Sequence, residues 1–514
     1  MLTFLVITGL IALHVVAIYS AGHALLHKRD SRSALGWVAV TLLVPFVGSV
    51  LYWLFGIARV DSRAVKIMEH AAQQLTGGLV DLHGKSLVAK PWGFVSERCL
   101  PADLVPLARP GKHITGRCMT GGNTLTPLHN GEAAYPVMLD AIDAAHRQVY
   151  LSSFIFGYDV VGKRFAEALK NAAERGCDVR VLMDGVGSFH PLARWRTRLG
   201  KAQLAYFLPP RLFPPQFSIN LRTHRKVLVC DQIAFTGGMN ISEHHLTARQ
   251  RPNRVQDLHF RCIGPIAVQL ELAFLMDWSF ATGSPIQLPV LPPESGRSAS
   301  VALQTGQTEQ TEQTGQVGQT NQTGSFSSFP AQNPRSSLCR ILMDGPGAPD
   351  ATIQDLICAQ ISTARRSVRI MSPYFLPPYP LATALVSAVL RDVDVSVILP
   401  GKNNHRLLDW AMRHHMPMLE EQGVQIFYQP PPFAHTKLLL IDDTYTLLGS
   451  ANLDPRSLNL NFELVMEVLD PALTSQLTAF YDEVKSRCAP APAQLPSLPV
   501  RLRNAASWIF SPYL

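Results

Sequence analysis

Charged residues are scarce in this sequence. Asp, Glu, Lys and Arg make up 16% of the 514 residues, whereas hydrophobic residues make up 47%. In soluble globular proteins about a quarter of the residues are charged, so this composition favours a membrane-associated protein. Acidic residues are fewer than basic residues, and the formal net charge is +8. An excess of positive charge suits an anionic partner, either phospholipid or nucleic acid.

The sequence also lacks any Cys-x-x-Cys pair, which argues against a cysteine-ligated zinc site. Its eight cysteines are scattered along the chain and do not form the dense pattern of a disulfide framework. We therefore expect reduced thiols facing a cytosol-like compartment. These cysteines stand at positions 99, 118, 177, 230, 262, 339, 358 and 488.

Two apolar runs stand at the N-terminus, from Leu2 to Leu26 and from Ala34 to Ala58. Each is long enough to cross the roughly 30 Å hydrocarbon core as a helix, so we expect a transmembrane hairpin over residues 1–60. No basic segment precedes the first run, which argues against a cleaved signal peptide. Pro45 and Gly48 leave a kinked or re-entrant second segment open. Positive charges on the two flanks are nearly balanced and do not fix the topology.

From Asn123 onward, helical periodicity alternates with short apolar strands. We expect helices over 132–146 and 163–175, strands over 149–156 and 178–183, and the same order again in helices 353–365 and 381–390 and strands 368–372 and 393–399. Such a repeat predicts two α/β domains, each a mainly β sheet flanked by helices, packed as a pseudo-dimer. The predicted parts are a connecting region (61–120), a first domain (121–290) and a second domain with a C-terminal tail (338–514).

The segment between the two domains, residues 300–335, has a different composition. Residues 304–328 are almost wholly Gln, Thr, Gly, Glu and Ser. Such a segment cannot bury enough apolar surface to offset its chain entropy, so we expect a disordered linker that acts as a passive tether.

One short pattern occurs twice, about two hundred residues apart. It consists of His-x-Lys, four further residues and an Asp, followed by a small-residue turn and an Asn. The first copy is His224, Lys226, Asp231 and Asn240, and the second is His435, Lys437, Asp442, Ser450 and Asn452. We expect strands over 225–230 and 436–441. Because residues two apart in a strand point the same way, each His should lie beside its Lys.

An imidazole beside a fixed ammonium is well suited to a phosphate group. The Lys and Asn side chains, with Ser450, are candidates for holding the non-bridging oxygens. One neutral imidazole can attack phosphorus while the other, protonated, donates its proton to the leaving alkoxide. The two histidines should then titrate as a pair, one charged and one neutral near pH 7. This chemistry requires neither a metal ion nor an organic cofactor.

These residues also have plain structural interpretations. A single His-x-Lys pair on a strand is usually a solvated edge, and only the second copy favours catalysis. Asp231 and Asp442 enter turns, where an Asp more often bonds the turn backbone than takes part in catalysis. The first copy has Gly238 where the second has Ser450, which puts a phosphate contact there in doubt. Six other histidines have no counterpart across the repeat and are interpreted as ordinary: positions 14, 23, 244, 245, 414 and 415.

The doubled pattern resembles the signature of the phospholipase D superfamily, and the surrounding sequence resembles the bacterial cardiolipin synthases within it. The segments that carry the resemblance are residues 45–48, 54–56, 184–188, 223–226, 372–375, 449–454 and 511–514. The resemblance implies an enzyme of the bacterial inner membrane, with several membrane passes and with catalytic domains facing the cytoplasm. It implies phospholipid as the partner, with no nucleic acid and no obligate protein partner.

The resemblance also implies a mechanism. One histidine takes the phosphatidyl group from phosphatidylglycerol as a phosphohistidine and releases glycerol, and a second phosphatidylglycerol then accepts the group to give cardiolipin. In similar enzymes an acidic residue roughly thirty positions downstream orients each histidine. The matching residues are Asp257 after His224 and Glu463 after His435. His224 is the expected nucleophile and His435 the expected acid and base.

Other functions use the same residues. With water as the acceptor, the site would be a phosphodiester hydrolase acting on phospholipid or nucleic acid, and the donor lipid could also be phosphatidylethanolamine. The membrane segments argue against a nuclease, as does the lack of aromatic residues interleaved with basic ones. A non-catalytic scaffold is disfavoured because both His-Lys pairs are intact.

Overall fold

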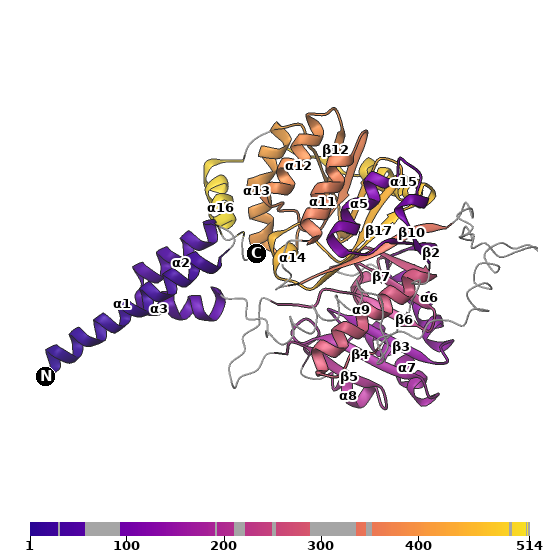
Figure 1. Ribbon diagram of the computed structural model, residues 1–514, viewed down its shortest axis with the longest axis horizontal. Helices are drawn as coiled ribbons and strands as arrows, with labels where there is room; N and C mark the ends of the chain where they lie inside the picture. The colour runs from indigo at the N-terminus through magenta and orange to yellow at the C-terminus, as the bar shows by residue number, and fades with distance from the viewer. Residues whose placement is uncertain are drawn as a thin grey trace, which may run out of the picture.

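The computed structural model describes residues 1–28, 31–56, 93–190, 193–209, 221–248, 253–287, 336–345, 352–492, 496–509 and 511. Within these ranges, a group of N-terminal helices projects from a body made of two α/β halves (Figure 1). The predicted linker at 300–335 and residues 57–92 of the predicted hairpin and connecting region lie outside the described residues.

The N-terminal helix α1 (Leu2–His27) includes a stretch over Val6–His27 that is long and apolar enough to cross a membrane. Only 22% of this stretch is buried inside the protein. Large apolar side chains such as Leu10, Ile11 and Ile18 are exposed along it, as a lipid-facing helix requires. The first predicted membrane segment is therefore one continuous helix.

The second apolar run follows the kinked alternative. It forms α2 (Ser31–Leu43), α3 (Pro45–Leu51) and a π-helical turn at Tyr52–Gly56, so the expected continuous helix from Ala34 is broken. The break falls at Pro45, which has no amide hydrogen for the preceding turn. Gly48 permits the fold that results, since a side chain there would collide with the carbonyl oxygen of Val40.

Two polar contacts hold the broken segment against α1. The Tyr52 hydroxyl lies 2.7 Å from Nδ1 of His23, and Nε1 of Trp53 donates to Oγ of Ser20 at 2.9 Å. Within a bilayer these groups would lack water partners, so their pairing fixes how the helices meet.

The two halves repeat the same order of elements, as predicted. The segment before them has β1 (Phe94–Val95) and α5 (Val105–Thr115). The first half has β2 (Met119–His129), α6 (Asn130–Asp143), β3 (Gln148–Ser153), α7 (Val160–Glu174), β4 (Asp178–Asp184), α8 (Trp195–Arg198), β5 (Gln203–Phe207), β6 (Val227–Cys230), β7 (Ile233–Gly237), β8 (Val255–Gln256), β9 (Leu258–Ile263) and α9 (Pro265–Thr282).

The second half begins with β10 (Ser337–Asp344), α11 (Thr352–Thr363), β11 (Ser367–Met371), α12 (Tyr379–Val389), β12 (Asp394–Pro400), α13 (Arg406–Glu421), β13 (Gln425–Gln429) and β14 (Phe433–Ala434). It continues with β15 (Leu438–Ile441), β16 (Tyr445–Gly449), α14 (Pro455–Asn459), β17 (Glu463–Leu469), α15 (Pro471–Ser486), β18 (Ala489–Pro490) and α16 (Leu498–Ile509).

A single 16-stranded sheet runs through both halves. The first half contributes the order β2-β9-β7-β6-β3-β4-β5, and the second half contributes the matching order β10-β17-β16-β15-β11-β12-β13. Antiparallel pairing of β2 with β10 joins them at the centre (Figure 1). Each half thus covers the edge strand that the other would otherwise expose.

Helices cover both faces of this sheet. Residues such as Phe165 of α7 build a core on one face of the first half, and residues such as Leu385 of α12 build the equivalent core in the second. On the other face, Phe274 of α9 and Leu477 of α15 belong to one core that draws on strands of both halves. This shared core makes the two halves a single packed body.

Helix α5 lies in the region predicted only as a connection. Ala108 of α5 belongs to the core of the second half, and its carbonyl oxygen accepts a hydrogen bond from the buried Arg340 at 2.8 Å. The chain therefore contributes to the second half before it builds the first.

Arg225 joins the halves at the level of the sheet. Its side chain is 1% exposed and pairs with Asp277 of α9. It also donates to the carbonyl oxygens of Glu463 at 2.9 Å and Asp344 at 2.7 Å, both in the second half. One guanidinium thus satisfies three buried acceptors from separate elements.

We expect Arg225→Met to destabilise the protein by about 3–5 kcal/mol, because it leaves the Asp277 carboxylate buried and unpaired. Chemical denaturation in detergent would measure the loss. The double variant Arg225→Met with Asp277→Leu is the matched control and should recover much of the stability, since it leaves no unpaired charge. A single variant as stable as the parent would show that the pair does not hold the halves.

Candidate active site

Each motif segment crosses to the opposite half before it joins its own sheet. Thr223 pairs with Phe462 in a parallel bridge, and the His224 amide donates to the Phe462 carbonyl at 2.9 Å. In the second half, β14 pairs with β8, and the His435 amide donates to the Gln256 carbonyl at 2.8 Å. The sheet strands therefore begin at 227 and 438, two residues later than predicted, because the residues before them are paired elsewhere.

This crossing pairs each histidine with the acid of the other half. Nδ1 of His224 lies 3.1 Å from Oε2 of Glu463, and Nδ1 of His435 lies 2.6 Å from Oδ2 of Asp257. The expectation that each acid orients the histidine upstream of it in the same half is wrong. The two acids are the expected ones, but the pairing is exchanged by the bridges described above.

The partners of His224 define its tautomer. Its Nδ1 also lies 2.9 Å from the carbonyl oxygen of Ser450. A carbonyl and a carboxylate can only accept, so Nδ1 carries the proton and Nε2 keeps its lone pair. An imidazole held in this way has its nucleophilic nitrogen directed away from the acid.

The two acids have different surroundings. Glu463 accepts hydrogen bonds from Oγ of Ser450 at 2.5 Å, Oγ of Ser457 at 2.9 Å and Nδ2 of Asn461 at 3.2 Å. Burial alone would raise the pKa of Glu463, but His224, Lys226 and the hydrogen bond from Ser450 bring it below its ordinary value. Asp257 accepts from the amide of Leu258 at 2.8 Å, and burial raises its pKa.

The Gly238 and Ser450 difference between the copies follows from these acids. A side chain at Gly238 would collide with the Asp257 carboxylate, whereas Ser450 donates to the longer Glu463. The Ser450 hydroxyl, expected from the sequence to contact phosphate, is thus already bonded to the carboxylate. Its oxygen also accepts from the amide of Leu464 at 3.0 Å.

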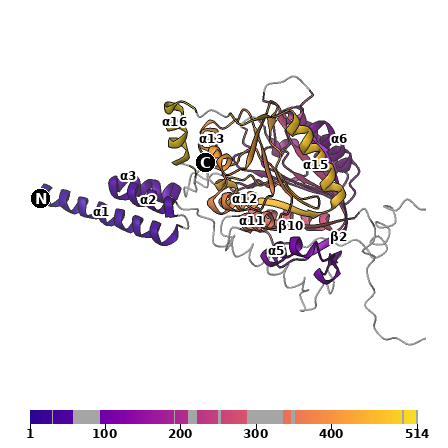
Figure 2. The ribbon, with the colours of Figure 1, turned by 90° about the horizontal axis from the view of Figure 1, so that it is seen from above.

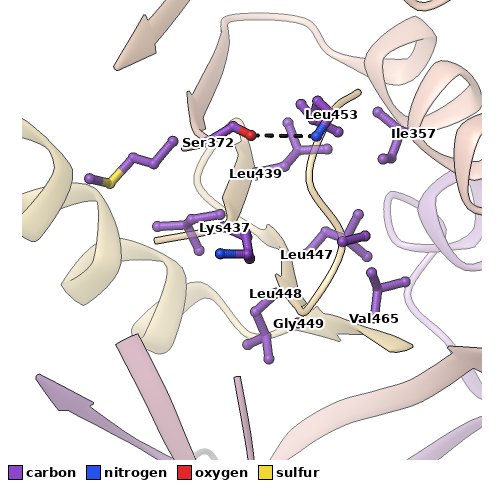
Figure 3. A pocket seen from close by; sticks show the side chains of 12 residues that line it. Ile357, Ser372, Lys437, Leu439, Leu447, Leu448, Gly449, Leu453 and Val465 are labelled. Atoms are coloured by element: carbon purple, nitrogen blue, oxygen red, sulfur yellow. Dashed lines mark hydrogen bonds between the residues drawn. The ribbon is translucent and has the colours of Figure 1, made fainter. Parts of the chain in front are cut away.

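Both motif lysines are buried beside their histidines. Nζ of Lys226 donates to the carbonyl oxygen of His224 at 2.6 Å, and Nζ of Lys437 lies 3.2 Å from Nε2 of His435. Burial lowers the pKa of Lys226 to about 7 and that of Lys437 to about 8. The Lys437 side chain borders a small cavity lined mainly by apolar residues such as Leu447 (Figure 3).

The same burial acts on the histidines. It lowers the pKa of His224 and takes that of His435 well below the ordinary value, with the lysines acting in the same direction. Lys437 lowers the pKa of His224, and His224 lowers that of His435, so the two copies act on one another. The protein's own groups therefore favour two neutral imidazoles near pH 7, and the expectation of one charged ring needs the added charge of an anionic phosphate.

The two motif asparagines are also buried. Oδ1 of Asn240 accepts a hydrogen bond from the backbone amide of Ile155 at 3.1 Å, so the Nδ2 group of Asn240 points away from that amide. Nδ2 of Asn452 donates to Oγ of Ser457 at 3.1 Å. Among the described residues, no group of three or more His, Cys, Asp or Glu side chains is placed to hold a metal ion.

The structure does not bring the motif aspartates to the histidines. Asp231 accepts from the amides of His146, Arg147 and Gln148, and Asp442 accepts from those of residues 365–367. Each lies at the far end of its strand, roughly 20 Å along the chain from the histidine. Both carboxylates therefore fix the start of the neighbouring strand, β3 or β11.

His245, interpreted as ordinary from the sequence, lies beside the site. Its ring centroid is 6.2 Å from that of His435, and its Nε2 accepts from the Asn240 amide at 3.2 Å. Burial lowers its pKa to about 3. His245 follows Asn240 by five residues, as Ser457 follows Asn452. Aligning the copies on their asparagines would have placed His245 opposite a residue that bonds Glu463.

Comparisons with known proteins show the family of this chain. Residues 138–256 and 357–485 match the family model described as cardiolipin synthase, phospholipase D-like domain. Residues 15–56 match a phospholipase D-nuclease N-terminal model. A cardiolipin synthase A of Pseudomonas entomophila is 30% identical over 471 residues, which covers 90% of this chain and 88% of that protein.

The chain belongs to the phospholipase D-like cardiolipin synthase family. Another cardiolipin synthase A, from Pseudomonas aeruginosa, is 28% identical over 479 residues and covers 92% of this chain and 88% of its own. A solved phosphatidylserine synthase of Haemophilus influenzae has a TM-score of 0.56 at 15% identity, covering 76% of this chain and 95% of that one. The similarity to the phosphatidylserine synthase structure shows a shared fold.

For this cardiolipin synthase family member we expect Asp231→Asn to lower stability by about 1–3 kcal/mol, because a neutral amide accepts the three strand amides less well. In the folded protein, kcat should stay near that of the parent. Thermal unfolding and steady-state kinetics would measure the two effects. Asp442→Asn is the matched control in the other half and should behave alike. A large fall in kcat with unchanged stability would restore a catalytic role.

We expect kcat/KM to fall as the pH rises from 7 to 9. Since the lysine pKa values are lowered to about 7 and 8, the positive charge is lost well below the ordinary range for lysine. The pH profile of kcat/KM reports the pKa values of the free enzyme. In contrast, kcat should stay high to a higher pH, because the bound phosphate raises the pKa of the lysines and keeps them protonated. Lys226→Arg should move the limb upward, since guanidinium stays protonated. A flat kcat/KM profile up to pH 9 would contradict this.

Proposed function

We propose that this chain is a membrane-bound phosphatidyltransferase that makes cardiolipin and glycerol from two phosphatidylglycerol molecules. The observation that carries the proposal is the pair of crossed histidine–acid contacts, which bring one imidazole from each half under the control of the other half. The relatives named cardiolipin synthase A, which match over most of the chain, point to the same reaction.

In the first step, Nε2 of His224 attacks the phosphorus of phosphatidylglycerol. The N–P bond forms as the P–O bond to glycerol breaks, and protonated His435 gives its proton to the departing alkoxide. The anionic phosphate supplies the charge that raises the pKa of His435 enough for it to carry that proton. The lysine ammonium groups, with the amides of Asn240 and Asn452, hold the non-bridging oxygens.

In the second step, the free hydroxyl of another phosphatidylglycerol attacks the phosphohistidine. His435, now neutral, takes the hydroxyl proton as the new O–P bond forms, and the N–P bond breaks to return neutral His224. Cardiolipin leaves with both phosphodiesters intact. The protons balance over the cycle, so the enzyme ends as it began.

The different acids support this order of roles. The histidine that becomes phosphorylated gains positive charge, which needs a carboxylate that stays ionised. Glu463 meets that need because its pKa is lowered and several donors hold it in place. Burial raises the pKa of Asp257, which suits a histidine that exchanges its proton in each step. Ser450 then acts as a positioning residue for Glu463.

The N-terminal helices support a location in the membrane. We infer a multi-pass protein of the bacterial inner membrane whose catalytic halves face the cytoplasm. Helix α1 supplies one crossing. All eight cysteines are free, which fits a reducing compartment.

The deciding experiment incubates the purified protein with labelled phosphatidylglycerol in mixed micelles and resolves the products. Cardiolipin and glycerol in equal amounts are the expected result. Phosphatidic acid as the main product would show a hydrolase. A product formed only when phosphatidylethanolamine is added would show a different donor.

Single variants separate the histidine roles. His224→Ala and His435→Ala should each abolish cardiolipin formation. A phosphatidyl ester of p-nitrophenol needs no proton for its leaving group, so His435→Ala should still release one equivalent of nitrophenolate in a burst. His224→Ala should release none. The opposite pattern would exchange the two roles, and substantial turnover of phosphatidylglycerol by either variant would contradict the mechanism.

A further inference from the structure

The C-terminal helix α16 is built with its polar side inward. It packs against α13, and on the packed side Asn504 is 2% exposed and Ser507 is 5% exposed. Three large apolar side chains point outward instead: Leu498, Leu502 and Ile509 are 64%, 62% and 71% exposed. A helix on the surface of a soluble protein has the reverse arrangement, with its apolar stripe against the core.

The outward residues form one stripe. Leu498 and Leu502 are one turn apart, and Ile509 returns to the same side two turns later, so all three lie on a single helix face. Contiguous apolar faces that remain exposed mark contact surfaces rather than chance. The described part of the protein places nothing over this stripe.

The inward side of α16 is already satisfied. The guanidinium of Arg503 stacks on the Trp410 ring of α13 at 4.3 Å and donates to Oδ1 of Asn504 at 2.9 Å. Trp508 packs against the His414 ring at 5.3 Å between centroids. These contacts hold the helix in this rotation, so its leucines point outward because of the way α16 is seated on α13.

The charge of α16 favours an anionic lipid surface. The helix carries Arg501 and Arg503, and it contains no Asp or Glu. Basic residues beside an apolar stripe are the pattern of helices that lie in the headgroup region of a bilayer. Anionic phospholipids attract such arginines, whereas a protein partner would need its own matching acidic groove.

The position of α16 matches this partner. It lies on the side of the second half that faces the N-terminal helices, as both views show (Figures 1 and 2). In both views α16 is inclined to α1 and does not continue along it, so α16 is not aligned with a membrane-crossing α1.

We propose that α16 is an interfacial membrane helix. Leu498, Leu502 and Ile509 insert among the outer segments of the acyl chains, and Arg501 contacts lipid phosphates. With α1 it gives the catalytic body two attachments, which fixes the tilt of that body relative to the bilayer. This inference rests on membrane attachment by α1 and not on the identity of the acceptor in the proposed reaction.

The test uses the full chain in nanodiscs of phosphatidylcholine and labelled phosphatidylglycerol. The photo-crosslinking residue p-benzoylphenylalanine replaces Leu502 in one variant and Lys170 in another. Lys170 is half exposed on α7 of the first half, which lies on the far side of the body from the N-terminal helices (Figure 1). Illumination should attach labelled lipid at position 502 and only background at position 170.

Two outcomes would overturn the proposal. Lipid labelling at position 502 no stronger than at 170 would show that the stripe faces water, and cross-linked dimers would show that a second copy covers it. The readout needs no catalysis, so it stands even if the proposed reaction is wrong.

A second variant tests the consequence. Leu498→Ser with Leu502→Ser changes only exposed side chains and should leave thermal stability unchanged. Activity on phosphatidylglycerol in bilayers should fall several-fold, while activity on a short-chain, monomeric phosphatidylglycerol should equal that of the parent. Equal activity of variant and parent on both substrates would contradict the role in orientation.

Discussion

The contact between an imidazole of one half and a carboxylate of the other is the interaction on which the rest of this structure depends. His224 has its acid in β17, and His435 has its acid between β8 and β9. Among the described residues, each motif histidine pairs with an acid of the other half, so neither half orients its own motif histidine. The paired β2 and β10, the shared core around α9 and α15, and Arg225 all hold the halves at the spacing that these two contacts require.

Burial of the site shifts the pKa values of its side chains, and it also costs free energy because charged groups are removed from water. A lysine removed from water loses its proton more readily, and the same desolvation keeps both imidazoles neutral. A phosphate that enters such a site raises the pKa of the lysines, so its binding itself favours their charged form. The protein offsets the cost of the buried Glu463 charge with three side-chain hydrogen-bond donors besides the histidine.

Local pattern predicted much of this from the sequence. The repeated His-x-Lys pairs and the duplicated order of helices and strands follow from spacing along the chain, whereas the choice of Asp257 and Glu463 follows from the resemblance to a known family. The exchanged pairing could not be predicted, because the bridge between Thr223 and Phe462 is a tertiary contact between distant residues. The same holds for Asp231, whose carboxylate bonds a strand that precedes it by more than eighty residues. Pro45 and Gly48 did mark the break in the second membrane segment, but the direction of the fold-back depends on packing against α1.

Joining the two halves in one polypeptide has a consequence for how the work is divided. Two identical subunits around a symmetry axis would be bound to give both histidines the same environment. Here one copy has Ser450 and a glutamate where the other has a glycine and an aspartate. In the proposed reaction, a duplicated gene thus lets one ring be tuned for bonding to phosphorus and the other for moving protons before any substrate binds.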